Sequence, residues 1–202
     1  FPQTFTGATV RPVIAPDMSS GISEMIRSAT TSIEIEQAYI TNESGTQLNP
    51  YLADAINASR RGVKVRVILD SFWYNTEGPA DNDEMVTLIN TIARHEGLPL
   101  EARLADLSMS GIEKVHNKGV IVDDTRVLVS SINWNSNSPN FNREAGLIID
   151  HPQVAMYFKQ VFDDDWAPAV RGRDDSPDVV RIAIVILVIF ILFFAWYRRR
   201  RW

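Results

Sequence analysis

The chain lacks cysteine entirely and has only three histidines among its 202 residues. The absence of cysteine excludes disulfide bonds, thiolate ligands for metal ions and a cysteine nucleophile. It does not identify a compartment, because proteins outside the cytoplasm can also lack disulfides. The histidines do not suggest a metal site, since neither His95 nor His151 stands at a ligand spacing from His116. We therefore expect no metal ion and no cofactor.

Positive charge is scarce in most of the chain, whose net charge is −5. Five of the 20 basic residues, Arg181 and Arg198–Arg201, lie in or beside the last apolar run. The other 15 face 25 acidic residues, so residues 1–178 carry a net charge of about −10. Such a domain has no overall attraction for polyphosphate chains, which disfavours broad nucleic-acid affinity but leaves room for a local basic pocket.

One long apolar run stands near the C-terminus. Ile182–Tyr197 contains no charge, proline or glycine, and with the three residues before it the run approaches the roughly 20 residues that cross a bilayer. Four arginines follow, and the positive-inside tendency places them in the cytoplasm. We predict a single-pass transmembrane helix over residues 179–198, with a basic cytoplasmic tail at 199–202. The globular part would then lie outside the cytoplasm, which requires an export signal upstream. The alternative is a buried core helix.

The remainder alternates short β-branched runs with helical patterns. The predicted strands are Thr9–Ile14, Ser32–Ile40, Val63–Leu69, Leu100–Leu104, Val115–Val122, Arg126–Ser130 and Ala145–Asp150. The predicted helices run from Asp17 or Ser19 to about Thr30, then Leu48–Arg61, Asn82–His95 and Pro152–Trp166. This alternation favours an α/β sandwich with a mixed sheet. The period of two in Ser32–Ile40 predicts a strand with one buried face.

The chain divides accordingly. Residues 15–167 form the globular domain, preceded by a connector and opening strand at 1–14. A polar, proline-containing tether at 168–178 joins the domain to the predicted membrane helix.

The stretch Val115–Asp150 carries the chemistry. Positions two apart on a strand face the same side, so His116 and Lys118 project together. The ammonium group favours the neutral imidazole that a nucleophile needs, and it supplies positive charge for a phosphate. Ser130–Asn133 (SSIN) offers hydroxyl and amide donors to phosphate oxygens. Glu144 can accept from the other ring nitrogen and hold the imidazole in one tautomer.

The spacing is more specific than the chemistry. His116, Lys118 and Asp123 fit H-x-K-x4-D, and SSIN follows after six intervening residues. This pattern resembles the phospholipase D superfamily, in which G-S/G-x-N usually occupies that place, and the resemblance covers about residues 10–165. It implies a phospholipase D-like α-β-α sandwich with a mixed central sheet. Ser130 departs from the usual glycine, and its Cβ would crowd the phosphate.

The resemblance also implies roles within a catalytic set of His116, Lys118, Asp123 and Glu144. His116 would be the nucleophile that forms a phosphohistidine, or the general acid that protonates the leaving group. Lys118, Ser131 and Asn133 would bind the phosphate. Glu144 would orient a catalytic histidine. Asp123 belongs to the motif, but its place past the strand indicates a structural ion pair rather than proton transfer.

A family active site is assembled from two such motifs, whereas this chain has one. Neither His95 nor His151 is followed by a lysine two residues later. The second motif therefore comes from a homodimer mate or from an upstream half. The chain begins with Phe1 rather than methionine, and its first residues have the character of a connector, so we favour a longer two-motif parent.

The function expected is that of a phosphodiester hydrolase or phosphatidyltransferase acting on phospholipids at a membrane. The membrane helix and the acidic domain favour this reading. One alternative is an endonuclease of the same superfamily acting on DNA or RNA, and another is a non-catalytic, membrane-anchored binding module. Phe72–Tyr74 can line the pocket, dip into lipid or pack in the core. Asp163–Asp165 is expected to be a solvated helix end.

Overall fold

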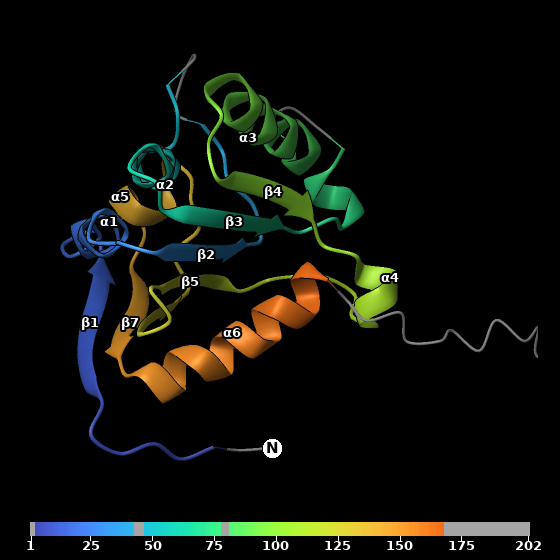
Figure 1. Cartoon of the computed structure of the whole chain (residues 1–202). Coiled ribbons are helices and arrows are strands. Elements are labelled where there is room, and N and C mark those ends of the chain that lie inside the picture. Colours follow the sequence, from blue (N-terminus) through green and yellow to red (C-terminus); the bar gives the residue numbers. More distant parts are fainter. Residues whose placement is uncertain (1–2, 43–46, 78–80, 168–202) are drawn as a thin grey trace, which may run out of the picture. The chain divides into compact units, whose positions relative to one another are not determined.

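A computed structural model describes residues 3–42, 47–77 and 81–167 (Figure 1). The predicted tether at 168–178, the predicted membrane helix at 179–198 and the tail at 199–202 lie outside these ranges. Within the ranges that are described, no helix is long and apolar enough to cross a membrane.

Seven strands form one mixed sheet in the order β1-β7-β6-β5-β2-β3-β4. Strands β2, β3 and β4 are parallel to one another, and every other neighbouring pair is antiparallel. The strands are β1 (Thr9–Ala15), β2 (Ser32–Gln37), β3 (Lys64–Leu69), β4 (Leu100–Leu104), β5 (Lys118–Val122), β6 (Arg126–Ser130) and β7 (Glu144–Asp150).

Helices cover both faces of the sheet, so the predicted α/β sandwich with a mixed sheet is confirmed. Figure 1 shows α1, α2 and α3 along one face and α6 across the other. The helices are α1 (Ser20–Arg27), α2 (Pro50–Arg60), α3 (Asn82–Glu96), α4 (Leu107–Ser110), α5 (Ser138–Phe141) and α6 (Pro152–Trp166), with a 3-10 turn η1 (Trp73–Asn75). The short elements α4, α5 and η1 were not predicted, because four residues or fewer carry no helical period.

Each helical layer buries its own apolar cluster. The larger cluster includes Ile26, Leu52 and Ile89 from α1, α2 and α3, packed on one face of the sheet. The smaller cluster includes Phe162 of α6 and Ile121 of β5 on the opposite face. The sheet is therefore buried on both sides at its centre.

This double burial corrects the prediction for β2. The strand was expected over Ser32–Ile40 with one buried face, but it ends at Gln37 and both faces are buried. Two carboxyl side chains, Glu34 and Glu36, lie under α6 rather than in solvent. Glu34 forms an ion pair there with Arg66, with 3.1 Å between the carboxylate oxygen and the guanidinium nitrogen. Alternation in a sequence shows which residues share a face, but not whether a distant helix covers it.

Candidate active site

The candidate site lies along one edge of the sheet, which we call the site edge. The parallel strands β2 and β3 end there, and β5 begins there because it runs antiparallel to β2, with Lys118 opposite Gln37. The end of β6 follows, with Ser130 opposite Lys118, and so does the start of β7. Five strands thus bring segments far apart in the sequence to one place.

His116 and Lys118 lie at the start of β5, but only Lys118 belongs to the strand. The strand was predicted from Val115 and begins only at Lys118, so His116 precedes it and is exposed. Lys118 is 4% exposed, and its Nζ donates to the backbone carbonyl of His116 at 2.7 Å. The Lys118 charge, and after it burial and the charge of Lys114, lower the pKa of His116. Burial is the main cause that lowers the pKa of Lys118.

Asp70 is a site residue that sequence reasoning missed. It follows β3 directly and is fully buried. Its Oδ1 accepts from the backbone N–H of Val115 at 2.7 Å. This N–H is therefore bound to Asp70 rather than to a neighbouring strand, and β5 begins only at Lys118. Its Oδ2 accepts from the side-chain amide of Asn75 at 2.8 Å. The Asp70 charge also opposes the fall in the pKa of His116. The available signal was an acidic residue directly after the apolar strand VKVRVIL.

In the part of the chain that the structure describes, Glu144 hydrogen-bonds to serine and asparagine side chains, and its expected role in orienting a catalytic histidine stays a prediction. Among the described residues, its Oε2 accepts from the hydroxyl of Ser131 at 2.5 Å. Its Oε1 accepts from Ser138 at 3.1 Å and from Asn142 at 3.3 Å. The bond from Ser131 is the main cause that lowers the pKa of Glu144. Within this chain the carboxylate therefore orients two hydroxyl donors.

Ser138 is a second residue that was missed. It is buried at the start of α5, and its hydroxyl both donates to Glu144 and accepts from the backbone N–H of Asn133 at 3.0 Å. The Oδ1 atom of Asn133 is buried without a hydrogen-bond partner among the described residues. Ser131, Asn133 and Glu144 are thus brought together through Ser138.

Ser130 stands at the usual glycine position, and the neighbouring strand β7 leaves room for its Cβ. Gly146 lies opposite it on β7, and a Cβ built at Gly146 would fall 2.6 Å from the Cβ of Ser130. The Ser130 hydroxyl donates to the carbonyl of Lys118 at 3.1 Å and accepts from the N–H of Ile132 at 3.2 Å. The extra side chain therefore ties β6 to the Lys118 backbone.

Asp123 is not brought to the other motif residues. It follows the far end of β5, a strand of five residues that spans about 17 Å. Its carboxylate accepts from the backbone N–H groups of Thr30, Thr31 and Ser32 at 2.7–3.1 Å. Burial alone raises its pKa, but these hydrogen bonds outweigh burial and hold the pKa at about 2. Arg126 lies 3.7 Å away, so the contacts of Asp123 fit the structural role expected for it, and we predict that it takes no part in catalysis.

Sequence comparison identifies relatives over most of the domain. Residues 22–166 match the family described as the PLD-like domain of cardiolipin synthase. The chain is 30% identical over 106 residues to mitochondrial cardiolipin hydrolase of Xenopus tropicalis. That alignment covers 52% of this chain and 43% of the relative, so the chain spans less than half of the relative's length.

Solved structures share the fold at lower identity. Nuc, a phospholipase D family member from Salmonella typhimurium, superposes with a TM-score of 0.63 at 24% identity, covering 79% of this chain and 95% of that one. NucT from Helicobacter pylori gives 0.60 at 19% identity over 79% and 96% of the two chains. Phosphatidylserine synthase from Haemophilus influenzae gives 0.60 at 17% identity over 83% and 40%.

Proposed function

The chain belongs to the family of PLD-like domains described from cardiolipin synthase, and from this premise we propose that it is one catalytic half of a phospholipid phosphodiesterase or phosphatidyltransferase. The observation that carries the proposal is the pairing at the site edge. An exposed imidazole, kept toward its neutral form, stands next to a buried ammonium group. The hydroxyl and amide donors Ser131 and Asn133 follow the end of the neighbouring strand β6.

The reaction proceeds in two displacements. A ring nitrogen of His116 attacks phosphorus, so that a P–N bond forms while the P–O bond to the leaving alcohol breaks. The leaving oxygen takes its proton from a second histidine. Water or an acceptor alcohol then attacks phosphorus, the P–N bond breaks, and the proton of the attacking oxygen passes to the second histidine. Splitting the displacement through a covalent intermediate lowers each barrier.

The other residues act on the phosphate. Lys118 supplies positive charge, and Ser131 and Asn133 donate to the non-bridging oxygens as negative charge develops. Glu144 accepts a hydrogen bond from the Ser131 hydroxyl and so fixes the orientation of that group. The second histidine comes from a second copy of the chain or from another half, because His116 is the one histidine in the sequence with a lysine two residues later.

Exposed aromatic side chains support a lipid substrate. Trp73 and Tyr74 lie in the segment that follows β3, on the side of the site edge. Their exposed fractions are 60% and 73%, so they do not pack in the core. Tryptophan and tyrosine side chains are enriched where the apolar and aqueous phases of a membrane meet. The net charge of about −10 on residues 1–178 also disfavours a polyanionic nucleic acid. The name of the relative, a cardiolipin hydrolase, points the same way.

The test measures phosphodiester cleavage by the full chain, prepared in mild detergent, on three substrates. The substrates are cardiolipin-containing vesicles, single-stranded DNA and the soluble ester bis(4-nitrophenyl) phosphate. We expect turnover of the vesicles and the soluble ester, lost by at least about 10²-fold in His116→Asn and retained in His95→Asn. Turnover that rises more steeply than linearly with protein concentration indicates self-pairing. DNA cleavage alone would replace the lipid proposal with a nuclease.

The aromatic residues allow a sharper version of the experiment. The double variant Trp73→Ser/Tyr74→Ser should lose vesicle turnover while it keeps turnover of the soluble ester. Equal losses on both substrates would mean that the two rings serve the chemistry or the fold rather than a lipid surface.

A further inference from the structure

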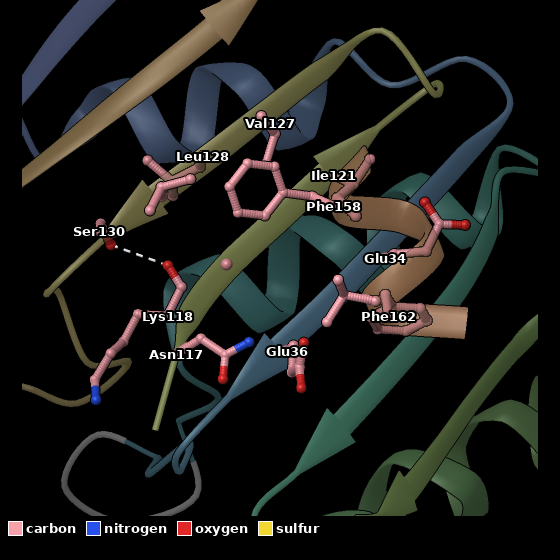
Figure 2. A pocket seen from close by; sticks show the side chains of 13 residues that line it. Glu34, Glu36, Asn117, Lys118, Ile121, Val127, Leu128, Ser130, Phe158 and Phe162 are labelled. Carbon is pink, nitrogen blue, oxygen red and sulfur yellow. Dashed lines mark hydrogen bonds between the residues drawn. The ribbon is translucent and has the colours of Figure 1, made fainter. Parts of the chain in front are cut away.

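A cavity of about 190 Å³ lies between α6 and the sheet (Figure 2). Its walls are mostly apolar and include Val127 of β6 with Phe158 and Phe162 of α6. Gly119 of β5 lies in its wall, and a Cβ built there would meet only the carbonyl oxygen of Leu128, at 3.7 Å, within 4 Å. The space exists because this strand residue has no side chain.

The polar end of the cavity is acidic. Glu36 is 6% exposed, and its Oε1 has no hydrogen-bond partner among the described residues. Figure 2 shows Glu36 beside Asn117 at this end. Burial, and then the neighbouring Asp165 of α6, raise the pKa of Glu36 to about 8. Burial also raises the pKa of Asp165, which shares a hydrogen bond with Glu36. Burial of Glu36 and the like charge of the neighbouring Asp165 therefore both disfavour the ionised pair, and a cation between them would favour it.

The cations of the protein near the cavity are already engaged: Lys118 also lines the cavity, but its Nζ donates to the backbone carbonyl of His116 at 2.7 Å. Arg66 pairs with Glu34 at 3.1 Å and with Asp163 at 2.7 Å, and its guanidinium lies 4.9 Å from the ring centre of Phe162. Lys159 pairs with Asp163 at 3.0 Å. The expectation of a solvated helix end at Asp163–Asp165 holds for Asp164, which is exposed, but not for its two half-buried neighbours. Asp163 belongs to an ion-pair network, and Asp165 turns toward a carboxyl group instead of a cation.

We propose that this cavity binds a small organic ammonium ion with a compact apolar body. The ammonium group takes the place of the proton shared by Glu36 and Asp165, and the apolar body fills the space beside Gly119. Apolar cavities of about 150 Å³ hold benzene, so a cavity slightly larger fits one aromatic ring bearing a methylene-ammonium group. The Phe158 ring in the cavity wall suits such a ligand, whereas the Phe162 ring already contacts Arg66 and Trp166. The acidic pair takes no part in the phosphodiesterase reaction, although Lys118 of the site edge also lines the cavity.

The test uses benzylamine as the probe and benzyl alcohol as its uncharged counterpart of equal size. Binding to the full chain is measured by calorimetric titration and located by the shift of the Gly119 backbone amide in NMR spectra. We expect saturable binding of benzylamine, at least tenfold tighter than that of benzyl alcohol, with a shift at Gly119. Equal affinity for the two probes, or no saturable binding of the amine, would overturn the proposal.

Two variants and one matched control complete the test. Glu36→Gln keeps the shape of the side chain and should abolish the preference for the amine. Glu34→Gln lies two residues earlier on the same strand, where the carboxylate is already paired with Arg66, and should retain that preference. Gly119→Val should fill the cavity and remove binding of both probes, with circular dichroism reporting that the fold persists. An unchanged amine preference in Glu36→Gln would place the ligand elsewhere and refute the site.

Discussion

The ammonium nitrogen of Lys118 donates a hydrogen bond to the backbone carbonyl oxygen of His116, with 2.7 Å between the two atoms. The lysine is the first residue of β5 and is buried, whereas the histidine precedes the strand and is exposed. One side chain thus fixes the backbone of the exposed histidine and also places positive charge beside its ring. The two residues of the motif form one unit because of this contact as well as their spacing.

The first prediction concerns the protonation of His116. Replacing Lys118 by methionine removes the largest cause that holds the pKa of His116 below its ordinary value, so the pKa should rise. NMR titration of the imidazole protons measures it directly. Lys114→Met should shift the pKa in the same direction but by less, because Lys114 is a smaller cause. An unchanged titration in Lys118→Met would show that the lysine does not govern the charge of the ring.

The second prediction separates a structural from a catalytic role for Asp123. Asp123→Asn weakens the bonds from three backbone N–H groups, so the free energy of unfolding should fall by about 2–3 kcal/mol. Turnover per folded molecule should stay unchanged. Because its folded pKa of about 2 lies below 3.8, the wild-type contribution is present above pH 3.8 and is lost as pH falls toward 2.

A matched control for Asp123 lies next to it. Asp124 shares the turn and has a similar backbone angle, with φ of 55° against 54°, a region that asparagine tolerates. Urea denaturation of Asp124→Asn should therefore show a much smaller loss. A fall in turnover of Asp123→Asn at full folding would keep the residue in the catalytic set.

The third prediction concerns the contact between β6 and β7 at the site edge. Gly146→Ala would bring a Cβ to 2.6 Å from the Cβ of Ser130, and overpacking of this kind costs about 1–3 kcal/mol. In a Ser130→Gly background the same change should cost less, because the opposing Cβ is gone. Gly119→Ala should be tolerated, since its nearest contact is 3.7 Å away. Strictly additive losses in the double variant would contradict the contact.

The fourth prediction concerns pH and the buried acidic pair. The folded carboxyl group of Glu36 keeps its proton to about pH 8, whereas the unfolded chain releases it near 4.5. Over this window the folded state binds more protons, so the free energy of unfolding should fall as pH rises, by on the order of a few kcal/mol. Glu36→Gln should flatten the dependence and be more stable than wild type at the upper end.

Denaturation midpoints across that pH range provide the measurement. Glu96→Gln serves as the control, because the pKa of Glu96 is lowered by Arg60 and its contribution changes only below 4.5. A wild-type stability that stays level from pH 4.5 to 8 would mean that the Glu36 carboxyl group is not held neutral.

Elements with a local signal were predicted well from the sequence. Helix α6 spans Pro152–Trp166 as expected, because Pro152 suits the first turn and the side chain of His151 accepts from the N–H of Val154. Strand β4 and strand β6 also match their predicted bounds. The spacing of His116, Lys118 and Asn133 likewise lies within one short stretch and led to the family.

The remaining features depend on residues that meet only in the folded chain. The bond from Val115 to Asp70 joins positions 45 apart, and those from Thr31 to Asp123 join positions 92 apart. The burial of Glu36 depends on α6, which crosses the sheet after more than a hundred intervening residues. The sequence by itself determined the alternation of elements and the chemical groups at the site edge, because propensity, capping and motif spacing act over a few residues. The tertiary structure alone decided that Glu144 accepts from the Ser131 hydroxyl, that the partners of Asp123 are the backbone N–H groups at the start of β2 and that Glu36 faces a second acid, because those outcomes depend on which distant surfaces pack together.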